Sequence, residues 1–379
     1  MVITMNCENK TVSVSTPSRV CLFGEHQDYL GLEVIALAIN LRFKAKASFR
    51  DDMLMKIRIR DEKLGILGEA ETDSYDEILI DLSQELTYEN SRDYFKSAIN
   101  VLKRSGLKIE CGADIVMDSE IPIGKGMCSS TTMTVVFTKA LMELYDHPEK
   151  DDPFMVAHYA WQAEVEEFNE PGGKMDHYAS ALGGLVHLDF QNGTEAEKLD
   201  VELPGCLILF DTLTRKDTIG VLKRAKNPVL AGLDELKKDG ITSIRDFYGH
   251  PEKLALLEHL DEEKSRKVKA QIRDFEILQE ALAMFKSGKI DDVHIGELIR
   301  EHHAMLRDGL GISTDKIEEI LDCAYAHGAL GGKLNGTGGG GCLWVYAREE
   351  DADEIVKAVA KLGYPGKILK QDRGVSKDA

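Results

Sequence analysis

The sequence has few of the features that mark secreted or membrane proteins. No apolar run approaches the roughly 18 residues that a membrane-spanning helix needs. The first residues, MVITMNCENK, lack the charged start and the long apolar stretch of a secretory signal. The seven cysteines are scattered and form no CxxC pair, which favours reduced thiols over disulfides or a zinc site. We therefore expect a soluble, cytoplasmic protein.

Positive charge is also scarce. Lysine and arginine together number 47, against 66 aspartates and glutamates, and the formal net charge is −19. This balance disfavours unspecific attraction to nucleic acid or to anionic lipid. An anionic ligand can still bind through a helix N-terminus, a single cationic side chain or a metal ion. We therefore expect no nucleic-acid or membrane partner, and a monomer or weak dimer.

A chain of 379 residues favours two domains, and its strand-like and helix-like segments are grouped in both halves. This grouping predicts the α+β class. A new succession of strand-like and helix-like segments begins near residue 206, so we expect one domain over residues 1–200 and another over residues 201–379. Strands are predicted at 11–16, 19–23, 33–40, 44–49, 55–60, 108–118 and 206–211, and helices at 93–106, 261–287, 291–307 and 315–327.

A glycine-rich turn lies within SEIPIGKGMCSSTTMTVVFTKALMELY, residues 119–145. Gly124 and Gly126 allow the backbone to turn tightly and to approach a ligand closely. Three residues that suit the N-cap of a helix follow the glycines: Ser129, Ser130 and Thr131. The apolar face of residues 133–144 favours a helix, although the β-branched residues before it favour a strand.

The N-terminus of this predicted helix would face the glycine turn. Such an arrangement binds phosphate, because free N–H groups and the positive end of the helix dipole point at the ligand. The chain has no GxxxxGK[ST] motif, so the turn is not a Walker A loop. An ordinary strand–turn–helix connection is the alternative interpretation.

A second glycine loop, GGKLNGTGGGGCLWVY, occupies residues 331–346 between two strand-like runs. Four successive glycines cost roughly 0.5–1 kcal/mol each in conformational entropy relative to alanine. A hairpin needs only one or two. Close approach to a bulky ligand, or to a facing loop of the other domain, explains the excess.

The segment WQAEVEEFNEPGGKMDHYASALGG, residues 161–184, predicts a helix, a Pro-Gly-Gly turn and a short second helix. Asp176 falls in the first turn of that second helix, where the dipole favours an ionised carboxylate. Such a group in a cleft can orient a hydroxyl and accept its proton. Glu164 lies twelve residues earlier, on the preceding helix. The alternative is that Asp176 only stabilises its helix.

Charged residues are concentrated in SRVCLFGEHQDYLG, residues 18–31, beside an apolar run. Buried charges are costly unless they are paired or hold a ligand. This stretch is therefore either a strand edge that faces water or part of a binding site for a polar ligand. The residues in question are Arg19, Glu25, His26 and Asp28.

These segments together resemble the GHMP small-molecule kinases, and among them the galactokinase branch. The stretch with the GEHxDY core is similar to the family's first motif, and IPIGKGMCSST resembles its PxGxGLSSS-type loop. PGGKMDH resembles the PxGxMDQ segment, and GGKLNGTGGGGC resembles the final GAxxTGxGxGGC motif. The resemblance implies a two-domain fold, with a ribosomal-protein-like β/α domain, a ferredoxin-like α+β domain and the active site between them.

The resemblance also implies a function and roles for individual residues. The protein would be an ATP-dependent sugar 1-kinase that uses Mg²⁺ and acts on galactose or a close relative. Asp176 would be the general base, with Arg19 beside it, and Ser130 and Glu164 would hold Mg²⁺. The ATP phosphates would lie on Gly124, Lys125, Gly126, Met127, Cys128, Ser129 and Ser130. The sugar would contact Glu25, His26, Asp28, Gly173 and Asp176.

The chain also departs from the galactokinase pattern. Lys174 stands where an apolar residue is usual, His177 where glutamine is usual, and Lys216 at a histidine position. The downstream tyrosine followed by paired arginines, which contributes a sugar contact in galactokinases, is missing. Another sugar, such as a uronic acid, N-acetylhexosamine or pentose, is therefore an alternative substrate. A non-catalytic sugar sensor and a kinase of another GHMP branch are further alternatives, and GEHQDY argues against the latter.

Overall fold

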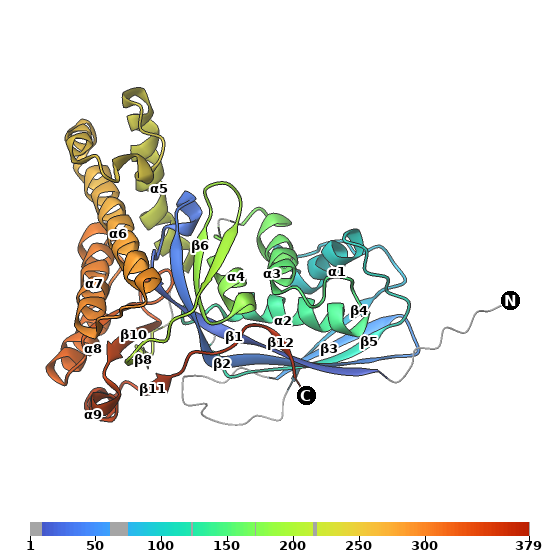
Figure 1. Ribbon diagram of the computed structural model, residues 1–379. Helices are drawn as coiled ribbons and strands as arrows, with labels where there is room; N and C mark the ends of the chain where they lie inside the picture. Colours follow the sequence, from blue (N-terminus) through green and yellow to red (C-terminus); the bar gives the residue numbers. More distant parts are fainter. Residues whose placement is uncertain (1–9, 61–74, 123, 171, 215–217, 379) are drawn as a thin grey trace.

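The computed structural model shows two sheets, each covered by its own helices (Figure 1). Backbone pairing in the larger sheet is mixed, whereas the smaller sheet is wholly antiparallel, and the predicted α+β class is confirmed. Among the described residues, no helix is both long and apolar enough to cross a bilayer. The structure describes residues 10–60, 75–122, 124–170, 172–214 and 218–378.

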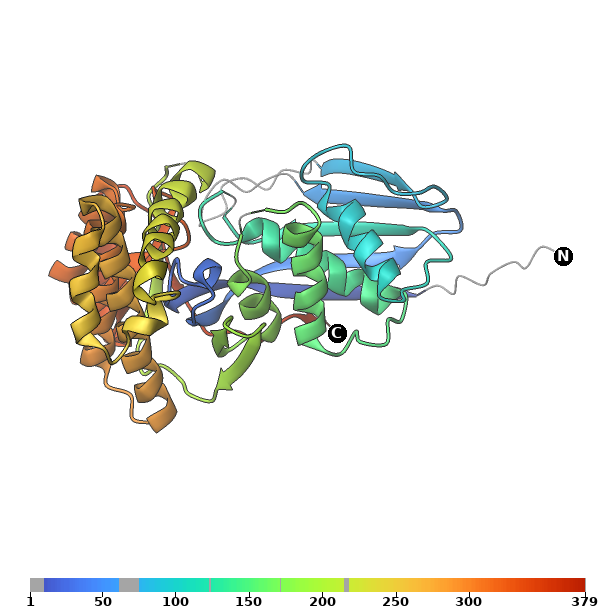
Figure 2. The ribbon, with the colours of Figure 1, turned by 90° about the horizontal axis from the view of Figure 1, so that it is seen from above.

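The larger sheet has the strand order β12-β1-β2-β5-β3-β4, and β6 and β7 extend it beyond β2. Helices from the same part of the chain lie on one of its faces (Figures 1 and 2). The strands are β1 (Thr11–Phe23), β2 (Val34–Phe49), β3 (Leu54–Arg60), β4 (Tyr75–Asp81), β5 (Ala113–Ser119), β6 (Leu185–Asp189), β7 (Glu195–Leu199) and β12 (Ser376–Lys377). The helices are α1 (Tyr94–Arg104), α2 (Ser129–Leu144), α3 (Pro153–Trp161) and α4 (Met175–Leu182), and the π-helical turn Gln162–Glu166 continues α3.

The smaller sheet has the order β11-β8-β10-β9, with helices stacked against it at the other end of the molecule (Figure 1). Its strands are β8 (Cys206–Asp211), β9 (Gly331–Leu334), β10 (Cys342–Ala347) and β11 (Gly366–Leu369). The helices are α5 (Thr218–Leu236), α6 (Glu262–Ser287), α7 (Asp292–Ala304), α8 (Asp315–Ala326) and α9 (Glu349–Lys361). Shorter turns are Asp28–Leu30, Lys237–Asp239, Ile244–Phe247 and Pro251–His259, which are 3₁₀, and Met305–Leu310, which is π-helical.

The helix predicted over 261–287 is confirmed as α6, and its ends follow from the sequence. Asp261 caps the N-terminus by accepting a hydrogen bond from the Lys264 N–H, at 2.9 Å. Gly288, with φ of 68°, ends the helix in the left-handed conformation that glycine adopts without strain.

Strands β1 and β2 are longer than expected. The runs predicted on either side of Pro17 form one strand, and the runs 33–40 and 44–49 form another. A shift in register between Pro17 and Ser18 lets the pairing of β1 with β2 continue past the proline. The prediction of separate short strands is wrong because the proline marks a bulge and not a strand end.

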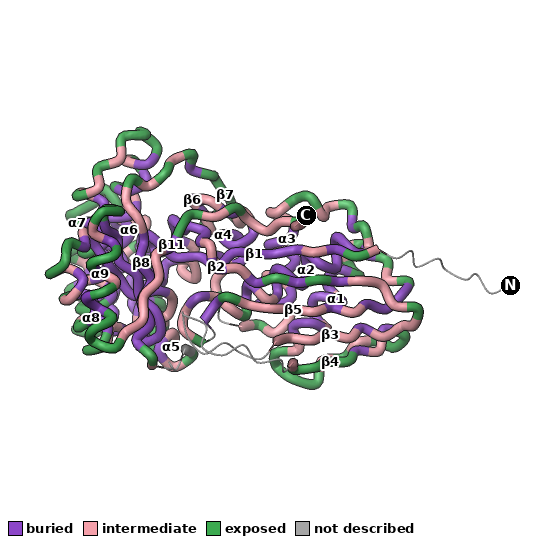
Figure 3. Tube along the Cα trace, turned by 90° about the horizontal axis from the view of Figure 1, so that it is seen from below, coloured by how far each residue is buried: buried purple, intermediate pink, exposed green. Residues whose placement is uncertain are grey.

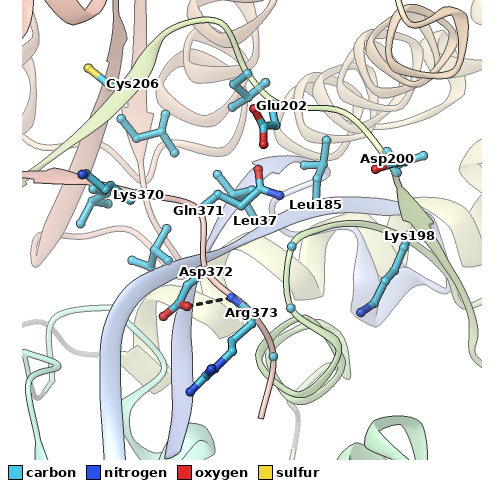
Figure 4. A pocket seen from close by; sticks show the side chains of 18 of the residues that line it. Leu37, Leu185, Lys198, Asp200, Glu202, Cys206, Lys370, Gln371, Asp372 and Arg373 are labelled. Carbon is cyan, nitrogen blue, oxygen red and sulfur yellow. Dashed lines mark hydrogen bonds between the residues drawn. The ribbon is translucent and has the colours of Figure 1, made fainter. Parts of the chain in front are cut away.

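The C-terminal tail returns to the larger sheet, where β12 pairs with β1. The Asp372 N–H donates to the Ala38 carbonyl of β2, at 3.0 Å. Figure 4 shows Asp372 on this crossing segment, close to the strand that carries Leu37. The assignment of residues 201–379 to one domain is therefore wrong for the tail, because β1 offers an edge with which the last residues pair.

Each sheet has its own buried core, and Figure 3 shows both as buried central segments. The expectation of reduced thiols is wrong for Cys111, which is disulfide-bonded. Pairing depends on which cysteines meet in the fold, and their spacing along the chain does not give that distance. The free cysteines of the described chain are Cys21, Cys128, Cys206, Cys323 and Cys342.

Candidate active site

A cleft of about 750 Å³ brings together most of the residues that the sequence singled out. Its walls come from β1, the turn after β1, the start of α2, the π-helical turn, α4 and the first turns of α5. The predicted residues that line it are Arg19, Glu25, His26, Asp28, Gly124, Ser129, Ser130, Glu164, Gly173 and Asp176. Those that do not line it are Lys125, Gly126, Met127 and Cys128.

Arg19 and Asp176 form an ion pair at the centre of the cleft. The Nε and Nη2 atoms of Arg19 both lie 2.7 Å from Asp176 Oδ1. Burial alone would lower the Arg19 pKa, but the charges around it, Asp176 first, and the hydrogen bond to Asp176 together outweigh burial, so the pKa is raised. Arg19 Nη1 also donates to the Gly126 carbonyl, at 3.2 Å. One buried cation thus fixes both the predicted base and the predicted phosphate loop.

Asp28 lies against the turn that precedes Asp176. A Cβ atom at Gly173 would lie 1.6 Å from Asp28 Oδ2, so only glycine allows this approach. The pKa of Asp28 is raised to about 6, mainly by burial and in second place by the negative charge of Asp176. Asp28 and Asp176 therefore face the same part of the cleft.

Glu25 lines the cleft, but its carboxylate already has a partner. Lys333 Nζ, from β9 of the smaller sheet, lies 2.8 Å from Glu25 Oε2 and also donates to the Cys21 carbonyl, at 2.9 Å. Both charged side chains are buried. Glu25 therefore joins the two sheets as well as bordering the cleft, a contact that the sequence did not indicate.

His26 borders the same region and contacts the second glycine loop. Its φ of 66° lies in the left-handed region, where a residue other than glycine is strained. The ring atom Nδ1 is 2.9 Å from the Tyr29 hydroxyl, and Nε2 is 3.3 Å from the Thr337 carbonyl. Thr337 and Gly336 also line the cleft.

Ser130, Glu164 and His177 form a hydrogen-bonded chain beside the start of α2. The Ser130 hydroxyl donates to Glu164 Oε1, at 2.7 Å, and His177 Nε2 lies 2.8 Å from Glu164 Oε2. Hydroxyl and carboxylate oxygens suit Mg²⁺, which usually takes few protein ligands together with substrate phosphates. No group of three or more His, Cys, Asp or Glu residues in the described chain could hold a metal ion alone. The donor set therefore fits a cation shared with a phosphorylated ligand.

Helix α2 begins at Ser129 with its N-terminus at the cleft, as predicted, but its cap differs. The N-cap is Cys128, with φ of 49° and no cap hydrogen bond from its side chain. The prediction that Ser129, Ser130 and Thr131 cap the helix is wrong, because they lie within its first turn. Their position leaves the Ser130 hydroxyl free to reach Glu164 across the cleft.

The two glycine loops contact each other directly. The Cys342 N–H donates to the Lys125 carbonyl, at 2.7 Å, and Asn335 Nδ2 donates to the Gly126 carbonyl, at 3.0 Å. A Cβ atom at Gly341 would lie 2.4 Å from the Lys125 carbonyl oxygen. Of the two explanations for the excess glycine, the approach of a facing loop is therefore confirmed.

The lysines near the site are placed differently from the sequence-based expectation. Lys125 Nζ pairs with the buried Asp211 Oδ1, at 3.1 Å, and Lys174 Nζ lies 4.3 Å from the centre of the Trp161 ring. Lys216 lies outside the described residues. The cleft instead receives Lys223 from α5.

Sequence analysis missed the contribution of α5. Ile219, Leu222 and Lys223 all line the cleft, and their i, i+3, i+4 spacing is the signal for one helix face. It also missed Arg92 and Tyr94, which precede and begin α1. No motif marked those two residues.

A hollow of about 900 Å³ lies elsewhere, between the segment after β7 and the C-terminal tail (Figure 4). Leucines from β2, α4 and β8 line it, and charged side chains such as Lys198, Glu202 and Arg373 surround them. None of the predicted catalytic or ligand-binding residues is among those that line it. The chemistry of the site is therefore assigned to the cleft around Asp176.

Comparison with known proteins agrees with this arrangement. Residues 93–184 match the N-terminal domain of the GHMP kinases, and residues 280–365 match their C-terminal domain. The chain belongs to the GHMP kinases. Residues 5–48 also match the galactose-binding signature of galactokinases. The resemblance drawn from the four motifs and the GHMP kinase fold are thus confirmed, and the chain is a kinase of the galactokinase-like type.

Individual relatives span nearly the whole chain. The galactokinase of Pasteurella multocida is 26% identical over 367 residues, which cover 94% of this chain and 90% of the relative. The mevalonate kinase of Thermococcus onnurineus is also 26% identical, over 373 residues covering 96% and 97%. The crystal structure of Lactococcus lactis galactokinase complexed with galactose superposes with a TM-score of 0.77, at 20% identity, covering 97% and 95%.

Proposed function

We propose that this GHMP kinase is an ATP-dependent sugar 1-kinase that phosphorylates the anomeric hydroxyl of galactose or a close relative. The observation that carries the proposal is the Arg19–Asp176 ion pair, which lies in one cleft with the N-terminus of α2. The galactose-binding signature over residues 5–48 supports a sugar as the acceptor. We expect the protein to act in the cytoplasm, as a monomer or weak dimer.

The proposed mechanism assigns the proton to Asp176. Its carboxylate accepts the proton of the anomeric hydroxyl while the hydroxyl oxygen bonds to the γ-phosphorus of ATP and the bond to the β–γ bridging oxygen breaks. Arg19 holds the Asp176 carboxylate in place before the transfer and offsets negative charge on the moving phosphoryl group. The other product is ADP.

The remaining cleft residues would position the two substrates. Backbone N–H groups from Gly124 to Ser130 would hold the ATP phosphates. Ser130 and Glu164 would bind Mg²⁺, which offsets charge on the β- and γ-phosphates. The sugar hydroxyls would contact four groups: Glu25, His26, Asp28 and Gly173. Positioning of this kind is the main requirement of phosphoryl transfer.

A mevalonate-type acceptor is the second candidate, because a mevalonate kinase is as similar to this chain as a galactokinase is. The two candidates predict different recognition. A sugar presents several hydroxyls that need polar partners, whereas mevalonate presents a carboxylate and few hydroxyls. The cleft offers the polar side chains His26 and Asp28 beside Asp176, which favours the sugar.

The test is an ADP-release assay with MgATP and a panel of acceptors. The panel contains galactose, N-acetylgalactosamine, arabinose, fucose, glucuronate, galacturonate and mevalonate. The proposal predicts release with galactose or another free monosaccharide and none above background with mevalonate. Release with mevalonate alone would overturn it. Binding of a sugar without any release would identify a sugar sensor and would also overturn it.

A further inference from the structure

We infer that His177 is a positioning residue that holds the Glu164 carboxylate in the orientation needed to bind the metal ion. This inference rests on the proposed function, because it takes Glu164 as a metal ligand.

The geometry fixes both oxygens of Glu164. Oε2 accepts from His177 Nε2, at 2.8 Å, and Oε1 accepts from the Ser130 hydroxyl, at 2.7 Å. The three hydrogen-bonded residues, Ser130, Glu164 and His177, all line the cleft. The carboxylate plane therefore cannot rotate without breaking one of the two bonds.

The His177 ring has no other hydrogen bond in the described part of the chain. Its Nδ1 atom is buried and has no partner there. The side chain is only 3% exposed. The hydrogen-bonding capacity that His177 uses is thus directed at Glu164, and a residue needed only to fill space would not require it.

His177 also connects two elements that carry chemistry. It follows Asp176 in α4, whereas Glu164 lies in the π-helical turn after α3, and π-helical turns are frequent at functional sites. The bond between them keeps the predicted base and the predicted metal ligand in a fixed relation. Partners of this kind commonly change metal affinity by 10–100-fold when they are removed.

The test measures Mn²⁺ affinity of the full-length protein in the presence of ADP, by electron paramagnetic resonance. His177→Leu should weaken Mn²⁺ binding about tenfold or more, and His177→Gln, whose amide can also donate to a carboxylate, should restore most of it. ADP affinity measured in EDTA should be the same in all three proteins. Unchanged Mn²⁺ affinity in His177→Leu would overturn the inference.

A matched control comes from a second buried histidine–glutamate pair. His303 Nε2 lies 2.9 Å from Glu318 Oε1 and, like His177, the ring is buried, but neither residue lines the cleft. His303→Leu should leave Mn²⁺ affinity unchanged. An equal loss in His303→Leu and His177→Leu would show a general structural effect and would overturn the inference.

Two further variants complete the design. If His177→Leu does not fold, His177→Asn replaces it, because the shorter amide cannot reach Glu164, and the same tenfold loss is expected. Glu164→Gln separates this inference from the proposed function. Wild-type Mn²⁺ affinity in Glu164→Gln would contradict the metal site itself, whereas a loss there with none in His177→Leu would contradict only the role of His177.

Discussion

The stretch SRVCLFGEHQDYLG supplies two ion pairs with very different surroundings. Arg19 pairs with Asp176 at 2.7 Å, and the Asp176 side chain remains 29% exposed to the cleft. Glu25 pairs with Lys333 at 2.8 Å, with side chains only 3% and 0% exposed. The first pair lies within the larger sheet and its helices, and the second links that sheet to β9 of the smaller one.

This difference separates a chemical role from a structural one within a single motif. A carboxylate that stays accessible, with a cation holding one of its oxygens, can take a proton from a bound hydroxyl. Glu25 borders the cleft, but its carboxylate is almost fully buried and held by Lys333, and loss of Lys333 alone would leave an uncompensated buried charge. We therefore expect changes to Asp176 of the first pair to affect turnover most and changes to Lys333 of the second pair, which does not line the cleft, to affect stability most.

The largest expected effect comes from breaking the accessible pair at its acid. Asp176→Asn keeps the shape of the side chain but removes the base, so ADP release with the best acceptor should fall by about 10²–10⁴-fold. The protein should still fold, with a smaller loss in the free energy of unfolding than Lys333→Met shows, because the Asp176 side chain is 29% exposed. Turnover near the wild-type rate would remove Asp176 from the base role.

Breaking the closed pair should give the opposite pattern. Lys333→Met leaves Glu25 charged and buried, and should lower the free energy of unfolding by about 3–5 kcal/mol. The double variant Glu25→Gln, Lys333→Met removes both charges and should recover much of that loss. Urea unfolding of the wild type and the two variants measures these free energies. A Lys333→Met protein as stable as the wild type would refute the structural role of the Glu25–Lys333 pair.

A smaller effect should come from the turn that supports the accessible pair. Gly173→Ala would place a Cβ atom inside the Asp28 carboxylate. Overpacking of this kind typically costs about 1–3 kcal/mol, so we expect kcat/KM for the sugar to fall by about tenfold. Gly172→Ala is the matched control, because its Cβ would meet only Val165, at an ordinary 3.5 Å. Equal kcat/KM in both variants would show that the approach of Asp28 to this turn is unimportant.

The smallest effect concerns the pH dependence of stability. The Asp28 pKa of about 6 exceeds that of an unfolded aspartate, about 3.9, so the folded state binds the proton more tightly. Asp28 therefore contributes its full share to the free energy of unfolding below about pH 4, and this contribution is lost as the pH rises through 6. From pH 4 to 7, the free energy of unfolding of wild type relative to Asp28→Asn should fall by about 2 kcal/mol. A flat difference would show that the pKa of Asp28 is not raised.

The sequence predicted features that depend on neighbouring residues better than features that depend on contacts between remote segments. The ends of α6 follow from Asp261 and Gly288, and the position of Asp176 in the first turn of α4 follows from the Pro-Gly-Gly turn before it. The four motifs also correctly indicated which segments share a cleft. Each of these inferences depends on residues a few positions apart or on a resemblance that spans the chain.

The errors arose where pairing between remote segments decides the outcome. The bulge after Pro17 and the tail that returns to β1 both depend on pairing with segments remote in the sequence. The same holds for Lys333, whose role as the partner of Glu25 no local pattern indicates. The pairing of the Lys125 side chain with Asp211 is a further contact between remote segments that no local pattern indicates.

The most direct test of the central claim is phosphorus NMR of the product formed from MgATP and the acceptor that releases most ADP. If Asp176 takes the proton of the anomeric hydroxyl, the spectrum should show one new phosphomonoester coupled to the anomeric hydrogen, and the Asp176→Asn protein should form almost none of it. A phosphomonoester on another carbon, or inorganic phosphate as the only product besides ADP, would contradict the account.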